Sequence, residues 1–240
     1  MGKKWIKIGV VKTGIEPHPI QFQILRYLVF HPKARFSELN ALKVPTDQFT
    51  FHLKTLVDGG LVTKTEEGKY DLTIVGKEFG NRLDTDGVGV EKLAKVTTLI
   101  VCIKKGKYLV QQRLKQPYFG YYGFFGGKIK YGDTPLQTAK RELEDETGLM
   151  AKKMTLVSLK HKMDYSETGK LLEDKYFFIF RAEGIKGKLI EEFEGGRNLW
   201  LTKTEILKIP NLFDGVDTIL ASIGKKQFSY IEKKYKVRGF

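Results

Sequence analysis

The sequence has 240 residues, of which 41% are hydrophobic and 29% are charged, and its formal net charge at pH 7 is +14. This length suits two domains, on a prior of about 100–200 residues each, and no apolar run approaches the roughly 20 residues that cross a bilayer, which excludes a membrane-spanning helix. The single cysteine, Cys102, excludes an internal disulfide and argues against a cysteine-based zinc site, so we expect a soluble, cytoplasmic protein with Cys102 buried in a strand.

Residues 1–90 are expected to form a small, mainly helical domain with a linker at its end. A short strand is expected within residues 1–15. Apolar residues then recur at helical spacing from Ile20 to Leu28, and further helices are expected at Phe36–Leu42 and Thr46–Asp58. Next comes a hairpin signal, two short apolar segments around Glu66-Glu67-Gly68, and the polar, glycine-rich run at 84–89 is the expected linker.

This region resembles the winged helix-turn-helix regulators of bacteria and archaea. The resemblance rests on the helix ending in the sequence FHLKTLV, on the Gly-Leu-Val that follows, and on the wing-like segment GKYDLT. It implies that the helix Thr46–Asp58 enters the major groove of DNA. The implied DNA contacts are Thr46, Gln48, Thr50, Phe51, His52 and Lys54 on the helix, and Lys64 and Lys69 on the wing. Modules of this type also mediate protein interaction or dimerisation, and that alternative stays open.

Residues 91–224 show a different pattern, in which strands surround one acidic helix. We expect an α/β or α+β fold, with a mixed sheet and flanking helices. The expected strands are Thr97–Ile103, Tyr108–Arg113, Leu156–Tyr165, Asp174–Ala182 and Leu199–Leu201, and the expected helices are Thr134–Thr147 and Asp214–Ile223.

Three carboxylates in the first of these helices point to a cation. Glu142, Asp145 and Glu146 stand at positions i, i+3 and i+4, which places them on one face, while Leu136, Ala139 and Leu143 form the opposite, buried stripe. Without a counterion the three acids would repel one another and destabilise the helix. Mg²⁺ suits such a cluster, because it prefers oxygen ligands and bridges carboxylates to substrate phosphates.

The surrounding sequence resembles the Nudix box, GX5EX7REUXEEXGU, in which U is a bulky apolar residue. Every spacing matches, from Gly127 to Leu149, and aspartate replaces glutamate at Asp133 and Asp145. The resemblance, which extends over about residues 94–224, implies a Nudix fold and hydrolysis of a diphosphate linkage in a nucleotide-type substrate. Because aspartate is one methylene shorter than glutamate, the carboxylate at position 145 is drawn back by about 1.5 Å. The resemblance therefore implies weakened activity as well.

The resemblance also implies roles for individual residues. Glu142, Asp145 and Glu146 would bind Mg²⁺, with Mn²⁺ as an alternative, and Glu146 or an acid outside the box would accept a proton from the attacking water. Arg141 would pair with Asp133 and orient the cluster, while Gly127 and Lys128, with Asp133, would lie by the substrate. Beyond the box, Glu194 is nominated as a further ligand or base.

Three functions follow from these patterns. The first is a hydrolase that carries a DNA-binding domain, and the second is a transcription regulator whose Nudix-like domain senses a nucleotide-type ligand without efficient turnover. The third is an RNA-directed enzyme, for which the only support is residues 225–240, expected to form a basic tail. A homodimer is expected because both module types often pair.

Overall fold

The computed structural model describes residues 17–40, 43–83, 92–225 and 227–238, and it divides the chain into two compact units, Met1–Lys92 and Leu93–Phe240. The strand expected within residues 1–15 and the linker expected at 84–89 lie outside the described residues. None of the helices within the described ranges has both the length and the apolar character that crossing a bilayer requires.

The first unit consists of three helices, a two-stranded sheet and a fourth helix. The elements are α1 (Pro19–Phe30), α2 (Phe36–Leu39), α3 (Thr46–Asp58), β1 (Val62–Lys64), β2 (Tyr70–Leu72) and α4 (Ile74–Gly80). Strands β1 and β2 pair antiparallel, with Val62 opposite Leu72. Their hairpin therefore follows α3 directly, as the Glu66-Glu67-Gly68 signal indicates.

Apolar side chains from α1 and α3 form the core of this unit. Phe22, Leu25 and Leu28 on α1 are buried together with Phe49 and Leu53 on α3. The helical spacing that predicted these two helices thus corresponds to their buried faces.

The second unit contains one mixed sheet. Its strands are β3 (Lys95–Lys104), β4 (Lys107–Arg113), β5 (Tyr122–Gly123), β6 (Leu149–Tyr165), β7 (Leu171–Gly187), β8 (Glu192–Phe193), β9 (Gly196–Leu201) and β10 (Ser229–Lys236). The strand order is β10-β6-β7-β3-β4-β9-β8, and β5 pairs with β4. Two neighbouring pairs are parallel, β3 with β7 and β10 with β6, and the others are antiparallel.

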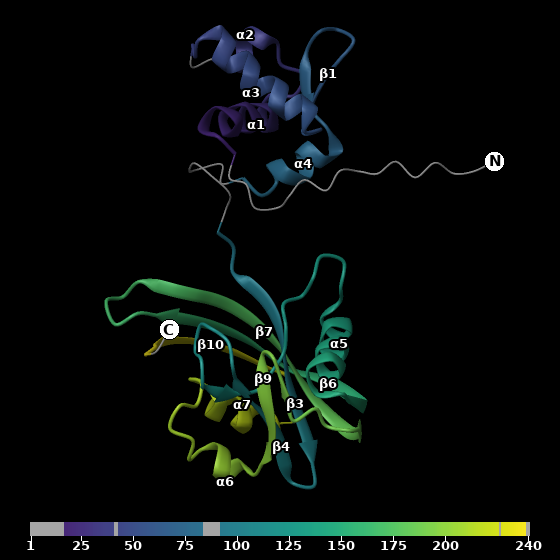
Figure 1. Ribbon diagram of the computed structural model, residues 1–240, viewed down its shortest axis with the longest axis vertical. Coiled ribbons are helices and arrows are strands. Elements are labelled where there is room, and N and C mark those ends of the chain that lie inside the picture. The colour runs from purple at the N-terminus through teal and green to yellow at the C-terminus, as the bar shows by residue number, and fades with distance from the viewer. Residues whose placement is uncertain (1–16, 41–42, 84–91, 226, 239–240) are drawn as a thin grey trace, which may run out of the picture. The chain divides into compact units, whose positions relative to one another are not determined.

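Helices cover both faces of this sheet (Figure 1). Helix α5 (Pro135–Thr147) packs on one face, where Leu143 meets Ile100 and Phe180 in one core cluster. The other face carries α6 (Lys203–Ile206) and α7 (Val216–Ser222), in a second cluster around Val101 and Ile179. Successive residues of β3 and of β7 therefore belong to the clusters on opposite faces of the sheet, because side chains alternate between the two faces of a strand.

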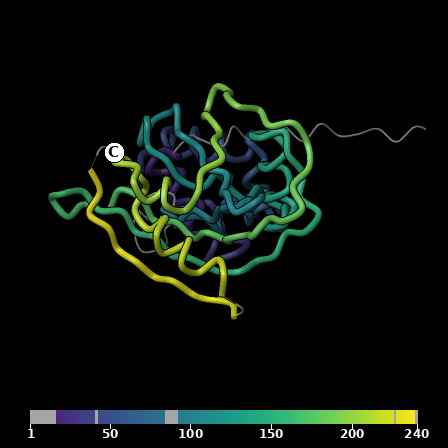
Figure 2. Tube along the Cα trace, turned by 90° about the horizontal axis from the view of Figure 1, so that it is seen from below, coloured from purple at the N-terminus to yellow at the C-terminus, as the bar shows by residue number. Residues whose placement is uncertain are grey.

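The segment expected to be a basic tail instead contributes a strand to the sheet. Residues Ser229–Lys236 form β10, which pairs in register with Ser158–Tyr165 of β6. In Figure 2 this yellow segment follows the edge of the second unit. Strand β10 therefore packs with the unit that contains the acidic helix.

Candidate active site

Helix α5 begins and ends at well-defined caps. The Thr134 hydroxyl accepts a hydrogen bond from the Gln137 backbone N–H, and the Gln137 side chain accepts one from the Thr134 backbone N–H. Pro135 fills the first turn, where its missing N–H has no cost, and Gly148 ends the helix in the left-handed conformation at φ 67°. These caps fix the register of the carboxylates between them.

The loop before α5 lies close to strand β3 and to the helix itself. Thr98 N–H donates to the Gly127 carbonyl at 2.9 Å, and a β-carbon on Gly126 would overlap the Thr98 carbonyl. A β-carbon on Gly127 would overlap the Glu142 carboxylate. The backbone of Thr98 therefore requires glycine at position 126, and Gly127 lets the loop backbone lie against the Glu142 carboxylate.

Arg141 joins two acids, Glu142 and the Asp133 that the family resemblance implies as its partner. Its Nη1 atom lies 2.6 Å from Glu142 Oε1, and its Nη2 atom lies 3.4 Å from Asp133 Oδ2. Thr138 donates a further hydrogen bond to Asp133. Arg141 thus orients the Glu142 carboxylate, and Asp133 orients Arg141.

Glu146, one turn after Glu142, is held by polar side chains of two strands. Gln111 on β4 donates to Glu146 Oε2 at 3.1 Å and to Asn198 Oδ1 at 3.3 Å. Asn198 on β9 donates to the Glu146 backbone carbonyl at 2.9 Å. Burial raises the pKa of Glu146, and the nearby Glu142 charge acts in the same direction, whereas the Gln111 hydrogen bond opposes both.

Glu142 and Glu146 line one cavity of about 760 Å³, together with the expected substrate residues Gly127 and Lys128. This volume lies within the roughly 300–1,000 Å³ that is typical of small-molecule sites. Asp133 does not line this cavity; it contacts Arg141, which in turn contacts Glu142. Asp145 and Glu194 are exposed and are not among the residues that line the cavity.

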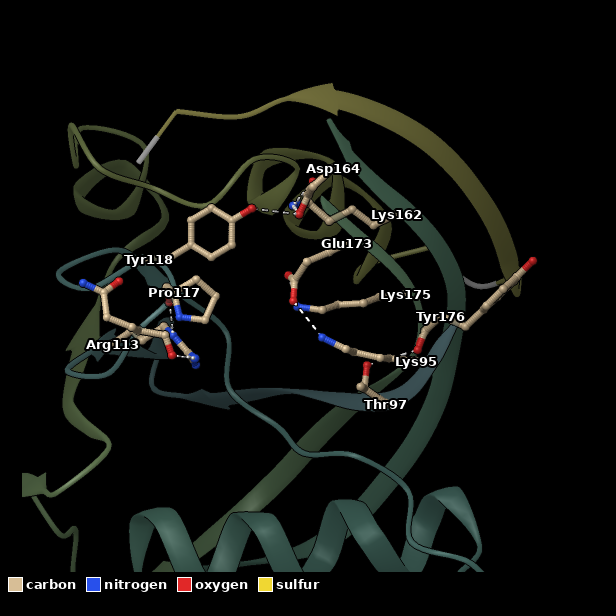
Figure 3. A network of polar contacts seen from close by, with 11 residues as sticks. Lys95, Thr97, Arg113, Pro117, Tyr118, Lys162, Asp164, Glu173, Lys175 and Tyr176 are labelled. Atoms are coloured by element: carbon tan, nitrogen blue, oxygen red, sulfur yellow. Dashed lines mark hydrogen bonds and ion pairs between the residues drawn. The ribbon is translucent and has the colours of Figure 1, made fainter. Parts of the chain in front are cut away.

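The part of the cavity remote from α5 is walled by an ionic network (Figure 3). Lys162 Nζ lies 2.6 Å from each carboxylate oxygen of Asp164, which also accepts a hydrogen bond from the Tyr118 hydroxyl. Glu173 pairs with Lys175 and, at 3.1 Å, with Lys95. Three strands, β3, β6 and β7, supply these charges.

Lys160 also lines this cavity and is only 1% exposed. Its ammonium group donates to the Gly215 carbonyl and to the Tyr235 hydroxyl of β10. Burial, together with the neighbouring Lys162 charge, lowers the pKa of Lys160 to about 8. Strand β10 thus contacts a lysine of the cavity wall, although no residue of β10 lines the cavity itself.

Arg113 forms part of the opposite wall, across from Glu173 and Lys95 in Figure 3. Its guanidinium donates to the backbone carbonyls of Pro117 and Gln116 at 2.6 and 3.0 Å. Burial lowers the pKa of Arg113, while the charges of Glu173 and Glu146 raise it. Arg113 therefore lies within electrostatic reach of both the α5 carboxylates and the ionic network.

The α5 carboxylates supply oxygen ligands, which divalent cations such as Mg²⁺ prefer. Within the described ranges, His, Cys, Asp and Glu side chains form no ready-made group of three for a metal ion. Glu142 and Glu146 nevertheless face one cavity from successive turns of a helix. Mg²⁺ is commonly held by one or two carboxylates plus waters and substrate phosphates, so these two acids meet its minimum need.

Gln111, Asn198 and the ionic network were not predicted from the sequence. A signal was present in β6, where Lys160, Lys162 and Asp164 occupy alternate positions and so share one face. Alternating charges usually mark a solvent-facing side of a strand. Here all three residues are buried beside the cavity.

Comparison with known proteins identifies residues 92–221 as a NUDIX domain. Over 138 residues the chain is 30% identical to an oxidized purine nucleoside triphosphate hydrolase from Danio rerio, which covers 56% of this chain and 83% of that protein. It is 28% identical over 110 residues to an 8-oxo-dGTP diphosphatase from Haemophilus influenzae, covering 42% and 79%. The crystal structure of a MutT protein from Bacillus halodurans matches with a TM-score of 0.53 at 24% identity, covering 61% of this chain and 93% of that one, and it supports the fold.

Proposed function

Because the chain belongs to the Nudix hydrolase family, we propose that it hydrolyses a diphosphate linkage in a nucleotide-type substrate with the help of Mg²⁺. One observation carries this proposal: Glu142 and Glu146 of the box line a single cavity of nucleotide size, next to Gly127 and Lys128. Mn²⁺ is the alternative cation.

In this proposal Glu142 and Glu146 would hold the cation, and Asp145, on the same helix, would be a further ligand. When bound, the cation would polarise the phosphoryl oxygens and lower the pKa of a water molecule. Arg141 keeps the Glu142 carboxylate in place through the 2.6 Å contact. Lys128 faces the same cavity and would neutralise phosphate charge.

Glu146 is the proposed proton acceptor. Its burial raises its pKa and makes it a stronger base than an exposed glutamate, while Gln111 fixes one of its oxygens. Glu194 is exposed and does not line the cavity, so its proposed role as ligand or base depends on a movement of its loop.

The test is a panel of nucleoside triphosphates, dinucleotides and nucleotide sugars, followed by mass spectrometry in the presence of Mg²⁺. Oxidised purine nucleoside triphosphates belong in the panel because the two curated relatives are named for such substrates. Glu146→Gln is expected to abolish turnover. Glu144→Gln is the matched control, because Glu144 is an exposed acid of the same helix that does not line the cavity. Equal rates for both variants would overturn the assignment.

A second proposal concerns the first unit, which we infer to be a winged helix that binds DNA. It is supported by the order of three helices, antiparallel hairpin and helix, and by the exposure of Thr46, Gln48, Thr50, Phe51 and Lys54 on α3. On the hairpin Lys64 is exposed, whereas Lys69 pairs with Glu67 at 2.9 Å.

His52 must be removed from the proposed reading face. It is buried, and its ring stacks on His18 at 4.1 Å between centroids. Fluorescence anisotropy with a mixed pool of duplex DNA would test the proposal, with Lys54→Ala expected to weaken binding and Lys104→Ala, in the second unit, expected to leave it unchanged. DNA binding that responds to a nucleotide without turnover would instead favour the ligand-sensing regulator.

A further inference from the structure

The cavity carries more positive than negative charge away from α5. Among the described residues that line the cavity, four lysines belong to the ionic network or contact its neighbours: Lys95, Lys160, Lys162 and Lys175. Three carboxyl groups lie among them, from Asp164, Glu173 and Asp214. Such an excess is costly in a partly buried site unless an anion neutralises it.

The pairings show where the excess lies. Lys162 and Asp164 neutralise each other, since both oxygens of Asp164 lie 2.6 Å from Lys162 Nζ. Glu173 serves two cations, Lys95 and Lys175. Lys160 donates to a carbonyl and a phenol and to no carboxylate of the described residues. One positive charge therefore remains at Glu173, whereas Lys160 has no ion pair with a described residue but lies among the charges of Asp217, Asp164 and Asp214.

The cations also repel one another. Burial lowers the pKa of Lys160 and Lys175, and in both cases the charge of Lys162 lowers it further. Lys95 acts in the same direction on Lys175. A bound anion would oppose each of these effects.

We propose that this end of the cavity binds an oxyanion, a phosphate or carboxylate group carried by the part of the substrate remote from the cleaved diphosphate. This inference rests on the proposed function and narrows its substrate class to compounds with anionic groups at both ends. Lysine ammonium groups act as point charges that suit such oxygens. Lys95 and Lys175 are the cations a ligand would meet, because their side chains are 47% and 23% exposed.

Arg113 links this subsite to the α5 carboxylates. It lines the cavity, and the charges of Glu173 and Glu146 both raise the pKa of its guanidinium. Its side chain is fixed by the carbonyls of Gln116 and Pro117, which leaves its charge free of a carboxylate hydrogen bond among the described residues. A single ligand in the 760 Å³ cavity can therefore contact both ends.

The test measures binding of inorganic phosphate to the full chain by isothermal titration calorimetry, in EDTA and at constant ionic strength. Because Lys128 near α5 could also hold phosphate, the variants at the basic end decide where the phosphate binds. Lys95→Met is expected to weaken binding about tenfold, the scale of one charge-assisted contact. Lys104→Met is the matched control, because Lys104 is an exposed residue of the same strand that does not line the cavity.

Lys175→Met should have a similar effect, and thermal unfolding of each variant verifies that it is folded. Acetate in place of phosphate distinguishes a carboxylate subsite from a phosphate subsite. Undetectable binding of both anions, or equal weakening by Lys95→Met and Lys104→Met, would overturn the proposal and favour a neutral group at this end. Glu146→Gln should bind phosphate normally while losing turnover, so failure of the subsite and failure of the proposed hydrolysis are separable.

Discussion

The Glu142 carboxylate lies against the backbone of Gly127, at the place where a β-carbon would be. Gly127→Ala should therefore push this carboxylate out of place and break its 2.6 Å contact with Arg141. A displacement of about 1 Å can cost roughly a hundredfold in rate, and we expect kcat to fall on that scale. Steady-state kinetics would measure this, with Gly224→Ala as a control, because a β-carbon on Gly224 would meet no atom within 4 Å. A Gly127→Ala enzyme with unchanged kcat would contradict the close approach.

Gln111 is a positioning residue for Glu146, since it holds one carboxylate oxygen at 3.1 Å. Partners of this kind, behind a metal ligand, typically contribute about 10–100-fold to metal affinity or activity. Gln111→Leu should reduce kcat and Mg²⁺ affinity on this scale while leaving the fold intact. Gln112→Leu is the matched control, because Gln112 is the next residue of β4 and does not line the cavity. Equal kinetics for the two variants would remove Gln111 from the site.

Lys160 should make the stability of the second unit depend on pH. Its pKa in the folded chain is about 8, below the ordinary value of 10.5, so between these two values the unfolded chain holds a proton that the folded chain has lost. Stability from this group therefore rises as the pH rises from about 8 to 10.5, by on the order of 3 kcal/mol.

Comparison of wild type with Lys160→Met by urea unfolding isolates this contribution. The difference in unfolding free energy between the two should change in favour of the wild type as the pH increases through this range. Lys104→Met, which alters an exposed lysine, should show a constant difference. A constant difference for Lys160→Met would show that the buried ammonium group is not desolvated.

Cys102 should be unreactive in the folded protein. Its side chain is fully buried in β3, and burial raises the pKa of its thiol to about 12, so very little thiolate exists at pH 8. A colourimetric thiol reagent should react quickly in urea and slowly in native buffer. Fast native reaction would indicate local opening of the central sheet.

The acidic helix could be predicted well from sequence because its signals are local. Thr134, Pro135 and Gly148 mark its ends, and the spacing within the box fixes which residues share a face. Even there, the expected buried stripe is only partly right. Ala139 and Leu143 are buried, whereas Leu136, in the first turn, is 38% exposed.

The deep end of the cavity could not be predicted, because its parts are remote in sequence. Lys95 and Glu173 meet only because β3 and β7 run parallel as neighbours, a pairing that no local pattern specifies. Strand β10 was missed for a related reason. Its sequence, SYIEKKYK, has few apolar residues, and it became a strand by pairing with β6. Tertiary pairing decided both outcomes.

In the first unit, periodicity predicted the helices but not the environment of every polar residue. His52 lies on α3 between exposed Phe51 and buried Leu53, at the margin of the buried face. Its contact with His18 depends on how the chain enters α1. Sequence spacing alone cannot distinguish such a residue from a solvent-facing one.

The two edge strands of the sheet, β8 and β10, bear on whether copies of this protein associate. A free strand edge is a template for association with another chain, and natural proteins protect such edges with charge or by keeping the strand short. One end here is β8, only two residues long. The other is β10, which displays exposed Lys233, Lys234 and Lys236. These like charges along the edge disfavour its pairing with the sheet edge of another chain.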